Sequence, residues 1–188
     1  MKVFALVLAL TSSMASASLW QLDNSQSSLH FISVKNDVVA ETHQFSQLNG
    51  SWDGNNVSIS VAVNSLETNI PIRNERIWQY VLQAEQYNAI TVSAELPQAM
   101  LPRGNDESTV VNLTLGVKIA AETAPLTAAV RITRLNDKTL QASTEAPIML
   151  NTNSFKLTAG VAKLQELAGL KRIDPLVPVN FNVLFKQQ

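Results

Sequence analysis

The stretch that decides the fold reads NVSISVAVNSLETNIPIRNERIWQYVL and occupies residues 56–82. Every second residue from Val57 to Val63 is Val or Ile, and small polar or neutral residues stand between them. This period of two is typical of a strand with one apolar face. The chain then turns, and Pro71 stands where the first turn of a helix tolerates a residue without an N–H group. A one-sided strand followed by a short one-sided helix predicts an antiparallel sheet curled around an apolar interior, with the helix closing one end.

The N-terminus has the pattern of a secretory signal peptide. An apolar run at residues 3–10 follows a lysine, and small residues stand at Ala15 and Ala17. We expect a signal peptide at residues 1–17, cleavage after Ala17, and one exported domain at residues 18–188. The run is too short to span a bilayer permanently, and no other long apolar run follows. The short signal favours a bacterial periplasm, and a secreted protein would share these features.

The composition excludes several classes of function. The chain has no cysteine, which rules out disulfides, thiol nucleophiles and thiolate metal sites. Without the signal peptide, which holds one lysine, 13 basic and 15 acidic residues remain, a net charge of −2. Bulk charge therefore does not draw the protein to nucleic acid. Only 11 aromatic residues occur, too few for the aromatic girdles of an outer-membrane barrel.

The alternation of apolar and polar residues predicts about eight strands and two short helices. The helices begin at Pro71 and Gly160, and the strands are expected at residues 19–22, 29–34, 45–52, 56–64, 89–96, 111–119, 126–135, 139–146 and 177–186. The order lacks a regular strand–helix–strand alternation, which disfavours a parallel sheet. Closure into an antiparallel barrel hides the apolar faces and removes the sheet edges. About eight strands leave an interior that is filled by side chains or holds one small ligand. A two-sheet sandwich is the alternative.

Several motifs, taken in their order along the chain, resemble those of the YceI-like family of exported proteins. They are WQLD at 20–23 with Ser28 and Phe31, SLET at 65–68, RNER at 73–76, FKL at 155–157, Gly160-Val161, and PVNF at 178–181. The resemblance covers nearly the whole predicted mature chain. It implies an all-β fold, a closed antiparallel, lipocalin-like β-barrel with a long apolar cavity. It also implies binding of a polyisoprenoid lipid such as an isoprenoid quinone or a polyprenyl phosphate.

The inward rows of the predicted strands, with Trp78 of the first helix, give the candidate lining of the cavity. These residues are Ile59, Val61, Val63, Trp78, Val92, Leu113, Leu115, Val117, Phe181 and Val183. Most positions in the rows carry Val, Ala or Ile, and small interior residues in a closed barrel leave room. Such rows are also the ordinary core of many proteins, so a filled barrel is the alternative.

Arg73 and Arg76 are the candidates for contacts with a lipid head group. They stand in a dense charged tetrapeptide near the expected mouth of the barrel, where a guanidinium can pair with a phosphate. The alternative is a solvated helix face with Glu75 as a local partner, or an arginine that ties the helix to the barrel.

The sequence shows no catalytic, metal or cofactor motif. His30 and His43 are the only histidines, and their spacing matches no metal motif even if Glu41 is added. A Gly-x-Ser-x-Gly nucleophile motif and a glycine-rich phosphate loop are also missing. We therefore expect a periplasmic carrier for a long-chain isoprenoid-type lipid, a quinone or a polyprenyl compound, and not an enzyme. An exported protein–protein interaction module with a filled barrel is the alternative, and pairing of two chains at a strand edge stays open.

Overall fold

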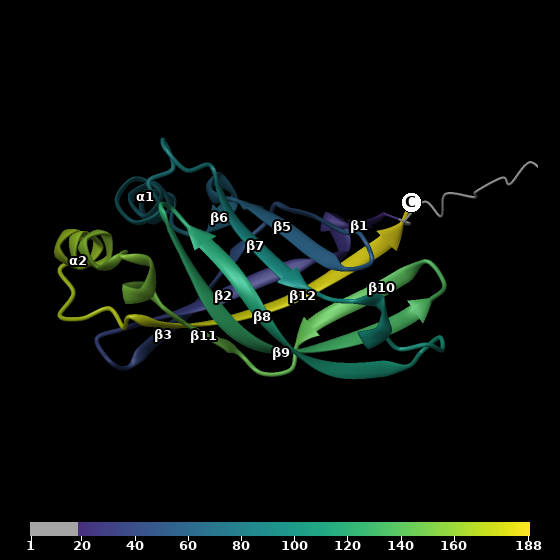
Figure 1. Ribbon diagram of the computed structural model, residues 1–188. Helices are drawn as coiled ribbons and strands as arrows, with labels where there is room; N and C mark the ends of the chain where they lie inside the picture. Colours follow the sequence, from purple (N-terminus) through teal and green to yellow (C-terminus); the bar gives the residue numbers. More distant parts are fainter. Residues whose placement is uncertain (1–18) are drawn as a thin grey trace, which may run out of the picture.

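The computed structural model describes residues 19–188, and its strands wrap around into a barrel with both helices at one end (Figure 1). The predicted signal peptide at residues 1–17 lies outside the described residues. Within residues 19–188, every helix is too short or too polar to reach across a membrane.

Twelve strands form one antiparallel sheet. Their bounds are β1 Trp20–Leu22, β2 Ser28–Lys35, β3 Val39–Phe45, β4 Leu48–Trp52, β5 Asn56–Ala62, β6 Leu66–Glu67, β7 Ala89–Glu95, β8 Ser108–Ile119, β9 Glu122–Asn136, β10 Thr139–Thr144, β11 Ile148–Asn151 and β12 Leu176–Gln187. The helices are α1 Pro71–Arg76, which continues as a π-helical turn η3 Ile77–Leu82, and α2 Thr158–Leu167. Short 3₁₀ turns are η1 Asn24–Gln26, η2 Val63–Ser65, η4 Gln98–Met100 and η5 Thr152–Phe155.

The sheet closes on itself through β12. Eight strands follow each other in the order β1-β4-β5-β7-β8-β9-β10-β12, and β12 pairs back onto β1 with Trp20 opposite Gln187. Strands β1 and β2 lie one after the other along the same edge of β12. Strand β1 pairs with residues 185–187 of β12, and β2 pairs with Val179–Asn182. The predicted closed antiparallel barrel with two helices is confirmed, and the sandwich alternative is wrong.

The sequence did not predict β3, the short β6 or β11. In β3, His43 and Phe45 are buried while Thr42 and Gln44 are exposed, so the strand alternates in the usual way. The pattern is hard to see because a histidine occupies an inward position where an aliphatic residue is expected. A tight turn precedes β3, in which the backbone N–H of Val38 donates to the carbonyl oxygen of Lys35 at 3.2 Å. Its two central residues, Asn36 and Asp37, have positive φ angles of 50° and 64°, as in a type I′ turn.

Large side chains close the end of the barrel that lies away from the helices, here called the closed end. Trp20 and Trp52 pack with ring centroids 5.7 Å apart, and the Trp52 indole N–H donates to the carbonyl oxygen of Leu96 at 2.9 Å. Leu101 and Phe185 are only 7% and 6% exposed and complete this layer. These buried groups close this end of the barrel, and the hydrogen bond fixes the orientation of the Trp52 indole.

At the other end, α2 packs closely on η3. A Cβ atom added at Gly160 would lie 2.1 Å from the carbonyl oxygen of Tyr80. Only glycine permits this approach of the two backbones, so α2 is held directly against the turn that follows α1.

Candidate functional site

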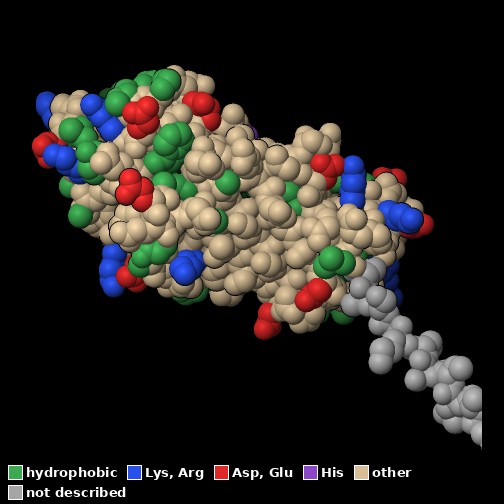
Figure 2. Space-filling view, turned by 90° about the horizontal axis from the view of Figure 1, so that it is seen from above, with side chains coloured by type: hydrophobic (Ala, Val, Ile, Leu, Met, Phe, Trp, Pro, Cys, Tyr) green, Lys and Arg blue, Asp and Glu red, His purple; other side chains and the backbone are tan. Residues whose placement is uncertain are grey.

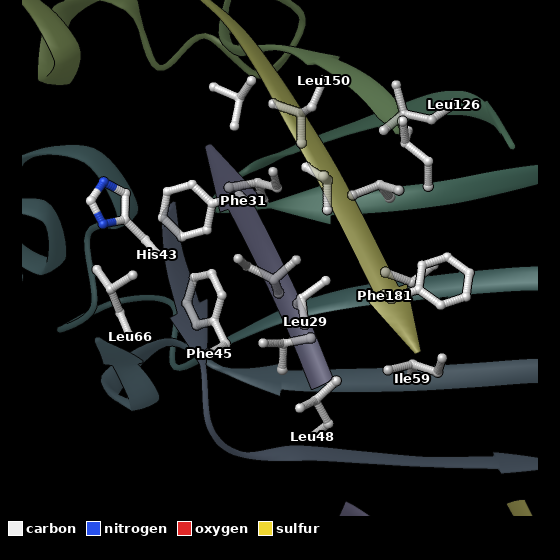
Figure 3. Close-up of a pocket in the computed structure, with 18 of the residues that line it drawn as sticks. Leu29, Phe31, His43, Phe45, Leu48, Ile59, Leu66, Leu126, Leu150 and Phe181 are labelled. Atoms are coloured by element: carbon white, nitrogen blue, oxygen red, sulfur yellow. The ribbon is translucent and has the colours of Figure 1, made fainter. Parts of the chain in front are cut away.

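The barrel encloses a cavity of about 580 Å³ that is lined almost entirely by apolar side chains (Figure 3). Small-molecule sites have volumes of roughly 300–1,000 Å³. Polar side chains contribute at only a few positions of the wall: Ser33, Lys35, His43, Arg73, Arg76, Thr152 and Asp174. The barrel is therefore not filled by its own side chains, which removes the premise of the filled-barrel alternative.

Eight of the ten apolar residues predicted to line a cavity lie on its wall. They are Ile59 and Val61 on β5, Val92 on β7, Leu113, Leu115 and Val117 on β8, and Phe181 and Val183 on β12. Strand register explains why they meet, because Val92 stands opposite both Ile59 and Val117 on its two neighbouring strands. Side chains in register on adjacent strands form one continuous layer of the wall.

Val63 and Trp78 do not line the cavity, and the sequence-based assignment of these two is corrected. Strand β5 ends at Ala62, and Val63 starts the 3₁₀ turn η2, so the alternation that predicted an inward side chain has already stopped. Val63 is 2% exposed and belongs to the packed core. Trp78 lies on η3 and packs against the core from outside the cavity, with its indole nitrogen buried.

The wall also contains residues that the sequence reading missed. Phe31 of β2 packs against Phe45 and His43 of β3, with ring centroids 5.7 Å and 5.1 Å away. Figure 3 shows Phe31 and Phe45 side by side on the cavity wall, with Leu29 next to them. The alternation of Leu29, Phe31 and Ser33 in β2 was a usable signal for this part of the lining. The contribution of α2 also had a signal, because Val161, Leu164 and Ala168 recur at the helical spacing i, i+3 and i+7, and all three line the cavity.

Three segments surround the opening of the cavity, and together they are called the mouth. They are residues 35–41 of the β2–β3 hairpin, residues 70–76 (α1 and the residue before it), and residues 167–174 (the last residue of α2 and the loop that follows). Arg76 Nη1 donates to the carbonyl oxygen of Leu167 at 3.4 Å, and Asn36 Oδ1 accepts from the backbone N–H of Lys171 at 2.9 Å. Only three cavity-lining residues of the described chain are exposed to solvent, namely Ile70, Ile72 and Ala168. All three belong to the mouth, so the cavity opens there.

A compact ion-pair cluster ties α1 to the barrel at the mouth. Glu41 accepts from Lys35 Nζ at 2.5 Å and from Arg73 Nη1 at 2.8 Å. The hydrogen bond from Lys35, with the positive charge of Arg73, holds the pKa of the Glu41 carboxyl below its ordinary value although partial burial opposes this. Arg73 Nη2 also donates to the carbonyl oxygen of Thr68 at 2.5 Å. Arg73 is therefore committed to joining the helix to β3, which is the structural alternative considered for it.

His43 is a neutral polar group within the wall. It is 4% exposed, and its Nε2 lies 2.8 Å from the Ser33 hydroxyl. Burial lowers its pKa, and the nearby positive charge of Arg73 lowers it further. In residues 19–188, no group of three His, Asp or Glu side chains is arranged to hold a metal ion. His30, the other histidine, lies on β2 opposite Asn180.

Arg76 is the available cation at the mouth. It lines the cavity, and its only side-chain hydrogen bond among the described residues is the 3.4 Å contact with the Leu167 carbonyl. No carboxylate of the described chain lies within ion-pair distance of it, in contrast to Arg73. A guanidinium with unused N–H groups at the opening of an apolar cavity can donate to a polar group of a bound molecule.

Comparison with known proteins places these features in context. A family model described as the YceI-like domain matches residues 20–185. A polyisoprenoid binding domain from Saccharophagus degradans implicated in plant cell wall breakdown superposes with a TM-score of 0.87 at 25% sequence identity, over 90% of this chain and 98% of that chain. Burkholderia cenocepacia BcnA shares the fold at 15% identity, with a TM-score of 0.62 over 87% of this chain and 98% of its own. A search of curated proteins found no match.

Proposed function

Because the chain belongs to the YceI-like domain family, we propose that it binds one long isoprenoid-type lipid with the apolar tail inside the barrel. The observation that carries this proposal is the cavity itself, which is about 580 Å³ in volume, apolar along its length and open at one end. The similar structure from Saccharophagus degradans, described as a polyisoprenoid binding domain, supports the same class of ligand.

The size of the cavity supports useful affinity from tail burial alone. If a tail buries about 400 Å² of apolar surface, the gross gain is on the order of 10 kcal/mol at about 25 cal/mol/Å². Association and ordering remove several kcal/mol of this. The branched aliphatic and aromatic wall supplies dispersion contacts along the whole tail, so a dedicated charged clamp is not required for binding.

The polar end of the lipid would lie at the mouth, next to Arg76. The closed end is sealed by Trp52 and Leu101, so the tail enters first and the head group stays near the opening. Arg73 uses both terminal nitrogens, Nη1 for Glu41 and Nη2 for a backbone carbonyl oxygen, and its unpaired Nε is buried. Arg76, in contrast, has unused donors at the opening. We assign the head-group contact to Arg76, which would donate to a quinone oxygen or to a polyprenyl phosphate.

We infer a carrier role without catalysis. Two acidic groups at the mouth are already paired, since Glu41 binds two cations and Asp174 lies 3.8 Å from Arg172, and burial lowers the pKa of His43. The predicted signal peptide at residues 1–17 supports a periplasmic site of action, where an apolar lipid needs a protein to cross water. N-terminal sequencing of the protein recovered from a periplasmic extract tests the localisation, and a mature chain starting at Ser18 is the expected result.

The binding proposal is tested by extracting the purified protein and identifying its lipids by mass spectrometry. A long-chain isoprenoid lipid in about equimolar amount is the expected result. The lipid-free protein should also take up geranylgeraniol from dilute solution. If no long-chain lipid is extracted and geranylgeraniol is not taken up, the proposal is wrong.

A further inference from the structure

The mouth carries large apolar side chains in full contact with water. Val38 is 83% exposed, Val39 45%, Ile70 43% and Ile72 51%, and these four residues are called the apolar rim. Val38 is the most exposed large hydrophobic residue of the described chain. Figure 2 shows hydrophobic side chains gathered, among charged ones, toward one end of the molecule. Exposed apolar groups gathered at one end of a molecule are typical of a site that contacts a protein, a membrane or a ligand.

The apolar rim is held in place and is not a loose loop. The hairpin before Val38 is fixed by Asn36, whose side chain accepts from the backbone N–H groups of Lys171 and Arg172. The pairs that Glu41 makes with Lys35 and Arg73 fix the hairpin to α1. The two segments that carry the rim are therefore tied to each other through Glu41 and Arg73.

The rim is also continuous with the wall of the cavity. Ile70 and Ile72 belong to both, because they are exposed to solvent and line the cavity. A lipid tail that enters or leaves passes these two side chains. If the rim faces water, the tail crosses water at this step, whereas contact with a bilayer gives it an apolar path all the way.

The charges of the mouth nearly cancel, so its contact with a membrane would depend on insertion of apolar side chains and not on attraction to charged lipids. The three segments, residues 35–41, 70–76 and 167–174, contain five Lys or Arg and four Asp or Glu, a net charge of +1. Most of the charged groups are paired with each other, as Arg172 is with Asp37 at 3.0 Å. The mouth thus has no strong preference for anionic lipids, and apolar contact dominates.

We propose that the mouth docks on the surface of a lipid bilayer, with the apolar rim inserted at the boundary between head groups and acyl chains. This inference rests on the proposed function, because the isoprenoid cargo is itself a membrane lipid. Val38 at the tip of the hairpin enters deepest, and Ile70 and Ile72 connect the acyl region with the cavity. The lipid then moves between bilayer and barrel without exposure of its tail.

Flotation of the lipid-free protein with neutral phosphatidylcholine vesicles tests the docking. The double variant Val38→Asp/Val39→Asp should bind these vesicles about tenfold or more weakly, because two rim side chains can no longer enter the apolar layer. Val38→Trp should bind more tightly, since tryptophan favours the membrane interface. The control Met100→Asp/Val110→Asp changes two exposed apolar residues outside the mouth, 47% and 44% accessible to solvent, and should bind as the wild type does.

A second measurement separates docking from cargo binding. Neither Val38 nor Val39 lines the cavity, so the double variant should take up geranylgeraniol from dilute solution normally and extract it from vesicles more slowly. The docking proposal is overturned if the rim variant floats with the vesicles as well as the wild type does. It is also overturned if the control variant loses as much vesicle binding as the rim variant, even when lipid uptake is normal. If uptake from solution fails for the wild type, the proposed function is wrong, and the flotation result still decides whether the rim binds membranes.

Discussion

Replacing Val117 by tryptophan tests whether the tail of the ligand occupies the middle of the barrel. Val117 is 6% exposed on β8 and faces the interior between Val92 and Ala124. An indole at this position extends into the space of about 580 Å³ that a lipid tail would use. If it removes about 100 Å² of contact with the tail, the loss at about 25 cal/mol/Å² is about 2.5 kcal/mol, or roughly a 70-fold higher Kd.

Isothermal titration calorimetry with geranylgeraniol measures this change. The matched control is Thr114→Trp on the same strand, because Thr114 is exposed and its side chain lies outside the barrel. Thermal unfolding shows whether each variant is folded, and a void that accepts the indole should leave the Tm of Val117→Trp close to the wild-type value. Unchanged affinity in folded Val117→Trp would refute the placement of the tail. An equal loss in Thr114→Trp would show that the effect does not arise in the cavity.

Three further predictions follow from the mouth and from the helix contact. Arg76→Gln should weaken binding of geranylgeranyl phosphate about tenfold, because a charge-assisted hydrogen bond is lost, and leave binding of geranylgeraniol unchanged in the same titration. Glu41→Gln should lower the Tm at pH 7, and the difference from the wild type should shrink as the pH falls below about 4. The reason is that the pKa of Glu41 is lowered in the folded protein, so its carboxylate stabilises the fold fully above the ordinary carboxyl pKa. This stabilisation is lost as the pH falls through the lowered pKa and the carboxylate is protonated. A thermal scan with equal Tm differences at pH 7 and pH 3 would contradict this. Gly160→Ala should destabilise the protein by about 1–3 kcal/mol in urea unfolding, since the added methyl meets a backbone oxygen, whereas Ala162→Ser on the exposed face of α2 should have little effect.

Strands with a clean alternation were predictable from the sequence. From Leu113 to Ile119, β8 has an apolar residue at every second position, and all of these residues face inward in the structure. Strand β3 was missed because its inward row begins with Glu41 and His43, which have partners that the sequence does not show. Their partners come from both sides, since Ser33 lies on β2 and Arg73 on α1.

The composition of the cavity wall was more predictable than the arrangement of its mouth. Alternation on β5, β7 and β8 indicates which side chains point inward, because it depends only on neighbouring residues. The mouth depends on contacts between Glu41 and Arg73, 32 positions apart, and between Arg76 and Leu167, 91 positions apart. The sequence therefore indicated that both arginines lie near the mouth, but it did not show that Arg73 is the one that holds α1 against the barrel.

The position of β12 in the chain has a consequence for how the protein reaches its native state. This strand pairs with β1 and β2 along one side and with β10 and β11 along the other, and all four precede it. The barrel cannot close before residues 176–187 have been synthesised. Until then the incomplete sheet has two unpaired edge strands, and its apolar inner face is exposed. Such late, long-range pairing makes folding slow and leaves the unfinished chain prone to aggregation.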